Sequence, residues 1–169
     1  RKMLSHYDNA TLYNDSIVAQ IVKRFQKQDA IVIYVPDHGE ECYEENRGFI
    51  CRNHSAEIDW PLAHYEFEIP FWIYCSPKYI RNHRDIYRQI RKAKDKRFMT
   101  DALPHLLLYL AGIETPTYKE EYNILSPKYD EMRPRILKNS ADYDKLRDAH
   151  LEKIKKEESK KVKKKERRN

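Results

Sequence analysis

The spacing of apolar residues near the start of the chain predicts a helix followed by a strand. Residues 30–35 form a continuous apolar run rich in β-branched side chains, which is typical of a strand buried on both faces of a parallel sheet. A helix followed by such a strand is the repeating unit of an α/β fold. The helix is predicted from apolar residues that recur at intervals of three and four and therefore share one face: Ile17, Val18, Ile21, Val22 and Phe25.

A second strand and two more helices are predicted further along. Residues 69–75 are again apolar throughout, and Ser76-Pro77 ends this strand and begins a helix. A later helix is expected to start at the capping pair Thr100-Asp101 and to end at Gly112. Its apolar residues predict a core helix: Leu103, Leu106, Leu107 and Leu110.

The remaining segments lack a steady period. Residues 42–66 are predicted to be a long loop, and loops of that length inside compact domains tend to be functional or disordered. Beyond residue 115 the chain alternates prolines with tyrosines and then turns into a weak helix from Ala141. We therefore divide the chain into a domain portion over 1–115, a Pro/Tyr-rich arm and helix over 116–151, and a basic tail over 152–169.

The charge of the chain is concentrated in that tail. The whole sequence has a net charge of +6, and residues 152–169 hold ten Lys or Arg against four Glu. The first 151 residues are therefore neutral in sum, which argues against a nucleic-acid groove binder, and no nucleic-acid partner is expected. The tail is interpreted as a solvated, frayed helix or a disordered segment, and attraction to anionic lipid or nucleic acid is its functional alternative.

Two predicted strands are too few for the sheet that they imply. A strand buried on both faces needs neighbours to satisfy its backbone donors and acceptors. The sequence therefore predicts the later portion of a larger α/β domain. No apolar run approaches the roughly 18 residues that a membrane helix requires, so this segment is expected to be soluble.

The chemistry is expected at the end of the first strand, where Asp37, His38 and Gly39 follow directly. Ligands of open α/β sheets bind at the carboxyl ends of strands. Asp and His are both good zinc ligands, and Gly allows a tight turn or a close backbone approach. Asp-His-Gly alone is a weak motif, because Asp and Gly are also common in ordinary loops.

The context of this motif resembles the metal-dependent phosphoethanolamine transferases of the alkaline phosphatase/sulfatase superfamily. The likeness covers about residues 5–115. It consists of a Tyr-Asp-Asn helix at residues 7–25, the Asp-His-Gly-Glu strand end, a loop histidine and an Ile-Pro strand, in that order. The resemblance implies an α/β fold with an alkaline-phosphatase-like parallel sheet flanked by helices, of which this chain would be the C-terminal part.

Residue by residue, the resemblance assigns three roles. Asp37 and His38 match the family's metal ligands, which hold zinc, with Mn, Mg or Ca as alternatives. His54 matches a histidine that contacts the transferred phosphate group or supports a second metal. His64 is a weaker candidate for that role, and His105 is interpreted as a structural histidine of the core helix.

The resemblance also implies a reaction that this chain cannot complete alone. The family transfers phosphoethanolamine from a phospholipid donor to a lipid A or glycan acceptor through a phospho-enzyme intermediate. Its Thr nucleophile lies upstream of the Tyr-Asp-Asn helix, so the nucleophile is expected in a missing N-terminal part of the same domain. The full-length protein is expected in the inner membrane with a periplasmic catalytic domain.

Two alternatives stay open. The same strand end serves sulfatases, phosphodiesterases and phosphoglycerol transferases of the superfamily, which differ mainly in the upstream nucleophile. Alternatively, the chain is a non-catalytic module that binds anionic partners through its basic tail.

Overall fold

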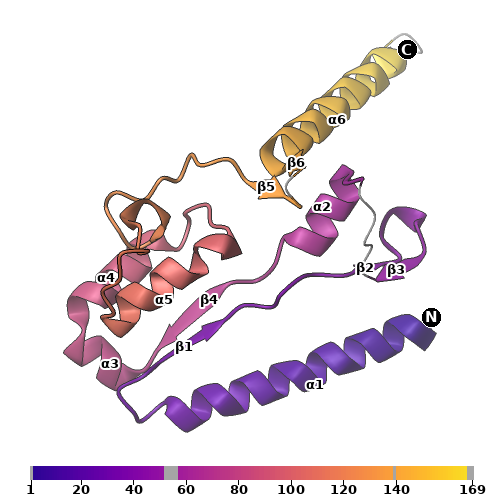
Figure 1. Cartoon of the computed structure of the whole chain (residues 1–169). Helices are drawn as coiled ribbons and strands as arrows, with labels where there is room; N and C mark the ends of the chain where they lie inside the picture. The colour runs from indigo at the N-terminus through magenta and orange to yellow at the C-terminus, as the bar shows by residue number, and fades with distance from the viewer. Residues whose placement is uncertain (1, 52–56, 139, 167–169) are drawn as a thin grey trace. The chain divides into compact units, whose positions relative to one another are not determined.

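The computed structural model describes residues 2–51, 57–138 and 140–166, which form two compact units. Unit 1 comprises Arg1–Val35 and Pro70–Arg133, and unit 2 comprises Pro36–Ile69 and Pro134–Asn169. Figure 1 shows the course of the chain. The elements of unit 1 are α1 (Lys2–Phe25), β1 (Ile31–Tyr34), β4 (Trp72–Cys75), α3 (Pro77–Asn82), α4 (Arg84–Ala93), α5 (Leu103–Ala111) and the 3₁₀ turns Thr100–Ala102 and Glu120–Tyr122.

Unit 2 contains the segment between β1 and β4 together with the C-terminal part of the chain. Its elements are β2 (Glu41–Cys42), the 3₁₀ turn Glu44–Asn46, β3 (Phe49–Cys51), α2 (Trp60–Phe67), β5 (Ile136–Leu137), β6 (Ala141–Asp142) and α6 (Tyr143–Glu166). The prediction of a featureless loop over residues 42–66 was therefore wrong. A two-residue strand and an eight-residue helix are too short for apolar periodicity to reveal them.

The two long apolar strands pair with each other in the antiparallel direction, whereas the sequence analysis predicted a parallel sheet. β1 and β4 run antiparallel, with Ile31 opposite Cys75 and Tyr34 opposite Trp72. The rings of Tyr34 and Trp72 stack at 5.1 Å between centroids. The parallel pairing was inferred from continuous apolar runs, which report burial and not direction. All eight strand residues are also only partly buried.

Ser76 fixes the start of α3 beside the turn that leads into β1. Its Oγ accepts a hydrogen bond from Tyr79 N at 3.0 Å, which caps the helix as the sequence predicts. The same hydroxyl donates to Gln28 O at 2.6 Å and is fully buried. The helix predicted after Ser76 breaks at His83, whose backbone leaves the helical region, so it forms two consecutive helices, α3 and α4.

The core of unit 1 forms around α5. The buried cluster consists of Ala93, Leu106, Ile124 and Leu125. The last two belong to the Pro/Tyr-rich arm, which the sequence analysis placed outside the domain portion, and they nevertheless pack into this core. Asn123 is fully buried beside them, and its side chain donates to Tyr118 OH at 2.9 Å and accepts from Leu125 N at 3.1 Å. These hydrogen bonds allow a polar segment to enter an apolar core.

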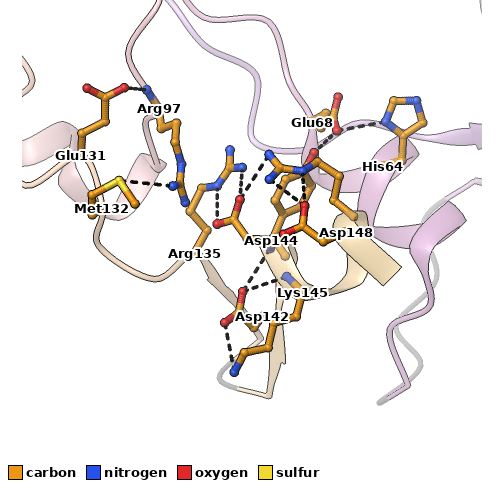
Figure 2. Close-up of polar contacts among 12 residues, drawn as sticks. His64, Glu68, Arg97, Glu131, Met132, Arg135, Asp142, Asp144, Lys145 and Asp148 are labelled. Carbon is orange, nitrogen blue, oxygen red and sulfur yellow. Dashed lines mark hydrogen bonds and ion pairs between the residues drawn. The ribbon is translucent and has the colours of Figure 1, made fainter. Parts of the chain in front are cut away.

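In unit 2, polar contacts join the start of α6 to the end of α2 (Figure 2). Glu68 pairs with His64 at 3.0 Å and accepts a short hydrogen bond from Tyr143 OH. Burial raises the pKa of Glu68, but these hydrogen bonds outweigh it and the pKa lies below its usual value. Arg135 binds Asp144 through two nitrogens, at 2.6 and 3.2 Å. The first turn of α6 is therefore held by charge and hydrogen bonding.

An ion pair in unit 1 gives the fold a testable pH dependence. Arg133 forks onto Asp101 at 2.6 and 2.7 Å, and its hydrogen bonds hold the pKa of Asp101 below the usual 3.8. A lowered native pKa stabilises the fold above the unfolded value and loses that effect as the pH falls below it. We expect Asp101→Asn to cost about 0.5–1 kcal/mol near neutral pH, because Asp101 is half exposed and the pair is screened.

Urea unfolding of wild type and Asp101→Asn, at about pH 7 and about pH 2.5, measures this contribution. Asp95→Asn is the control, since Asp95 is highly exposed and its partner among the described residues is Lys94, at 3.6 Å. A cost for Asp101→Asn that persists unchanged at the lower pH would show that the carboxylate charge is not its source.

Candidate metal site

Asp37 and His38 lie in the segment that follows β1, at the start of unit 2. The backbone N of His38 donates to Asp37 Oδ1 at 3.1 Å. The Asp37 side chain is 86% exposed, and the His38 ring is 26% exposed. His38 Nε2 lies 3.6 Å from Asp37 Oδ2, so the two side chains point toward each other.

The contacts of the His38 ring define its tautomer. Its Nδ1 lies 2.7 Å from Gly39 O, and because a carbonyl oxygen only accepts, Nδ1 carries the proton. In the neutral ring Nε2 therefore carries the lone pair, and it lies 3.6 Å from Asp37 Oδ2. Histidines that bind metals commonly donate the other ring N–H to a carbonyl in this way.

The two donor atoms fit a shared zinc ion. Two ligands of a tetrahedral zinc, each bound at about 2.0–2.2 Å, lie roughly 3.4 Å apart. The separation of Nε2 and Oδ2 is 3.6 Å, so a small rotation of the exposed Asp37 carboxylate would bring both into range. Among the residues that the structure describes, no three His, Cys, Asp or Glu side chains gather into a metal-binding group. Further ligands would have to join this pair.

Gly39 positions the pair against α2. Its N–H donates to Glu66 O at 2.8 Å, in the last turn of that helix. A Cβ added to Gly39 would lie 2.2 Å from Tyr65 O, so no residue with a side chain fits without displacing backbone. The glycine is therefore required for a close backbone approach, one of the two roles that the sequence suggests.

A buried ion pair next to this segment was not found from the sequence. Glu41 is fully buried in β2, and Arg47 Nε lies 2.6 Å from its Oε1. Burial raises the pKa of Glu41, and the charge of Arg47 opposes that rise. Arg47 also binds Asp59 at 2.5 Å, and Asp59 caps α2 by accepting from Leu62 N. This chain of contacts ties the hairpin β2–β3 to α2.

The other histidine candidates differ in their surroundings. His54 lies outside the described residues, so its predicted role in phosphate binding stays a prediction. His64 pairs with Glu68 and stacks on Trp60 at 5.4 Å, which is a structural arrangement. His105 accepts a hydrogen bond from Lys119 N at 3.1 Å, consistent with the structural role expected for it.

Comparison with known proteins decides the family. A model of the family described as Sulfatase matches residues 1–113. The chain belongs to the sulfatase family. This match covers the helix α1, the Asp-His-Gly segment, β4 and α5, which are the parts of the sequence that carry the resemblance described above.

Relatives place the chain beside one branch of the sulfatase family. Phosphoethanolamine transferase EptC of Escherichia coli O18:K1:H7 (strain RS218 / NMEC) is 32% identical over 128 residues, covering 74% of this chain and 21% of the relative. Kdo(2)-lipid A phosphoethanolamine 7''-transferase of E. coli K12 is 29% identical over 99 residues, covering 57% and 16%. The chain spans about a fifth of the length of these relatives. The resemblance to phosphoethanolamine transferases is thereby confirmed.

A solved structure supports the fold class. The crystal structure of the C-terminal periplasmic domain of EptC from E. coli in complex with Zn matches with a TM-score of 0.65 and 30% identity. The match covers 83% of this chain and 39% of the solved chain. The α/β sulfatase-family fold is confirmed, with the correction that β1 and β4 pair antiparallel. No helix in the described ranges combines the length and apolar character needed to cross a membrane.

Proposed function

We propose that this chain supplies two zinc ligands, Asp37 and His38, to an enzyme that transfers phosphoethanolamine from a phospholipid to a lipid A or glycan acceptor. The transfer proceeds through a phospho-enzyme intermediate on a Thr nucleophile that another part of the domain provides. Two relatives carry names of this activity, and a solved relative contains zinc. The working location is the periplasmic side of the inner membrane, in line with the domain named for that relative.

One observation carries the proposal: Nε2 of His38 and Oδ2 of Asp37 lie 3.6 Å apart, with Nδ1 of His38 engaged by Gly39 O. The lone pair on Nε2 and the carboxylate are therefore both available to one cation. A nitrogen donor beside an oxygen donor favours zinc over magnesium or calcium, which prefer oxygen ligands alone. Mn remains a weaker competitor for the same donors.

The residues of this chain have three tasks in the reaction. Asp37 and His38 hold the cation, and the carbonyl of Gly39 keeps the His38 ring in the tautomer that can bind it. Zinc, when bound, lowers the pKa of an attacking hydroxyl and neutralises charge on the phosphoryl oxygens. His54 is proposed to donate a hydrogen bond to the transferred phosphate group or to the leaving oxygen.

Zinc titration of the dialysed 169-residue chain, followed by calorimetry, tests the site without requiring turnover. Wild type should bind one zinc ion, and Asp37→Ala and His38→Ala should each weaken binding by roughly a hundredfold or more, since each removes a ligand outright. Asp95→Ala is the matched control, because the exposure of Asp95 equals that of Asp37 to within a percent.

Equal zinc affinity in wild type and in both alanine variants would contradict the proposal that Asp37 and His38 bind zinc. A second arm tests the reaction itself: residues 1–113 replace the matching segment of E. coli EptC, and phosphoethanolamine transfer is measured by mass spectrometry of the acceptor. Transfer that survives Asp37→Ala in this chimera would contradict the proposed role. Cleavage of sulfate esters in place of transfer would support a sulfatase activity instead.

A further inference from the structure

The neutral sum of the first 151 residues conceals a strongly basic surface in unit 1. Residues 77–97 contain nine Lys or Arg and only two Asp, a net charge of +7 within 21 residues. Residues 77–93 of this segment form α3 and α4, and the last four residues follow α4. Acidic residues elsewhere in the first 151 residues cancel this charge, so the sum over that range does not reveal the basic segment.

α4 separates its basic residues from its apolar ones. Ile86, Ile90 and Ala93 belong to the core cluster formed with α5, and Gln89 accepts a hydrogen bond from Tyr109 OH at 2.9 Å. Figure 1 shows α4 beside α5. Position 88 lies four residues after position 84, and positions 91 and 92 lie three and four residues after position 88. These four residues therefore share the helix face opposite to the apolar residues, and all four are exposed.

We define the arginine face as the exposed cations of α3 and α4: Lys78, Arg81, Arg84, Arg88, Arg91 and Lys92. Arg88 pairs with Asp85. For the other five, no carboxylate partner occurs within the ranges that the structure describes. Exposed cations of one sign, without acidic partners, create a positive potential that falls off within about 10 Å in physiological salt.

We propose that the arginine face docks this protein on an anionic phospholipid bilayer. The guanidinium group donates two parallel hydrogen bonds to phosphate, which suits the headgroup layer better than a lysine-only surface would. The choice of a membrane over other polyanions rests on the proposed function, since both the donor and a lipid A acceptor reside in membranes. The exposure of these six cations on α3 and α4 is independent of the proposed function.

Docking of this kind would hold the enzyme near its lipid substrates without contributing to the chemistry. Each Lys or Arg close to an anionic surface strengthens binding by roughly fivefold, so three of them contribute roughly a hundredfold. The basic tail offers a comparison within the same molecule. Lys153, Lys160 and Lys161 of α6 are also exposed, and they lie on a helix outside the sulfatase match.

Sedimentation of the 169-residue chain with lipid vesicles tests the proposal. The vesicles are phosphatidylcholine alone or phosphatidylcholine with about a third phosphatidylglycerol, at low salt and at roughly 0.5 M salt. Wild type should bind only the anionic vesicles, and salt should release it. The triple variant Arg81→Gln/Arg84→Gln/Arg91→Gln should bind roughly a hundredfold more weakly, with an unchanged circular dichroism spectrum.

The triple variant Lys153→Gln/Lys160→Gln/Lys161→Gln changes the net charge equally and is the matched control. An equal or larger loss in this control would assign binding to net charge or to the tail and overturn the proposal. The proposal would also be overturned if wild type failed to bind the anionic vesicles, or if it bound duplex DNA more tightly than the vesicles. The assay needs neither zinc nor turnover, so the docking face and the metal site can fail independently.

Discussion

Replacing Leu106 with Ala is expected to lower the free energy of unfolding by about 3 kcal/mol. Leu106 is fully buried in α5, and it packs with Ala93, Ile124 and Leu125 at the centre of unit 1. Removing its side chain loses the transfer free energy of the deleted carbons and leaves a cavity that helices on both sides cannot fill. Urea unfolding followed by circular dichroism measures the difference.

Leu107→Ala is the control for this substitution. It is the next residue of the same helix and loses the same atoms, but Leu107 is 45% exposed. We expect a cost of about 1 kcal/mol or less for this variant. Equal costs for the two variants would mean that the buried cluster does not determine the stability of unit 1.

The contrast between these leucines also shows what the sequence could predict. The spacing of apolar residues identified α1, β1, β4, α5 and the start of α3, because the sequence of each element carries a periodic or continuous apolar run. Leu107 was included in the predicted core because it lies at the edge of the same stripe. Periodicity defines the direction of a face, and it does not define how far packing extends around the helix.

The direction of strand pairing and the long-range contacts could not be predicted from the sequence. The antiparallel pairing of β1 and β4 depends on where unit 2 returns the chain, which no local pattern encodes. Burial of Ile124 and Leu125 depends on Asn123, whose amide satisfies a polar turn inside the core. A segment rich in proline and tyrosine gave no periodic signal of that burial.

The residues of the candidate metal site could be proposed from the sequence, but the contacts that orient them could not. Asp37 and His38 come shortly after the apolar run that forms β1, and ligands of open α/β sheets gather at the carboxyl ends of strands. Their mutual orientation depends on Gly39 and on α2, whose eight residues lay within a predicted loop. The buried pair of Glu41 and Arg47 was hidden for a related reason, because an acidic stretch in a sequence reads as solvated surface.

Replacing Gly39 with Ala should disrupt both the local fold and the metal site. The new methyl group would lie 2.2 Å from Tyr65 O, and this backbone oxygen can retreat only if the last turn of α2 moves. That movement would break the hydrogen bond from Gly39 N to Glu66 O. We expect a cost of about 2–3 kcal/mol in unfolding free energy and zinc binding roughly tenfold weaker or worse, since the carbonyl that orients His38 belongs to residue 39.

Gly48→Ala separates this steric effect from the general cost of replacing a glycine. Gly48 has φ +90°, so alanine there is strained by about 1 kcal/mol, but its Cβ would meet no atom within 4 Å. Zinc binding should therefore stay at the wild-type level in Gly48→Ala while it falls in Gly39→Ala, in parallel calorimetric titrations. Equal zinc affinity in both variants would mean that the contact between residue 39 and α2 does not orient the two ligands. The tautomer of His38 would then be controlled by something other than this segment of backbone.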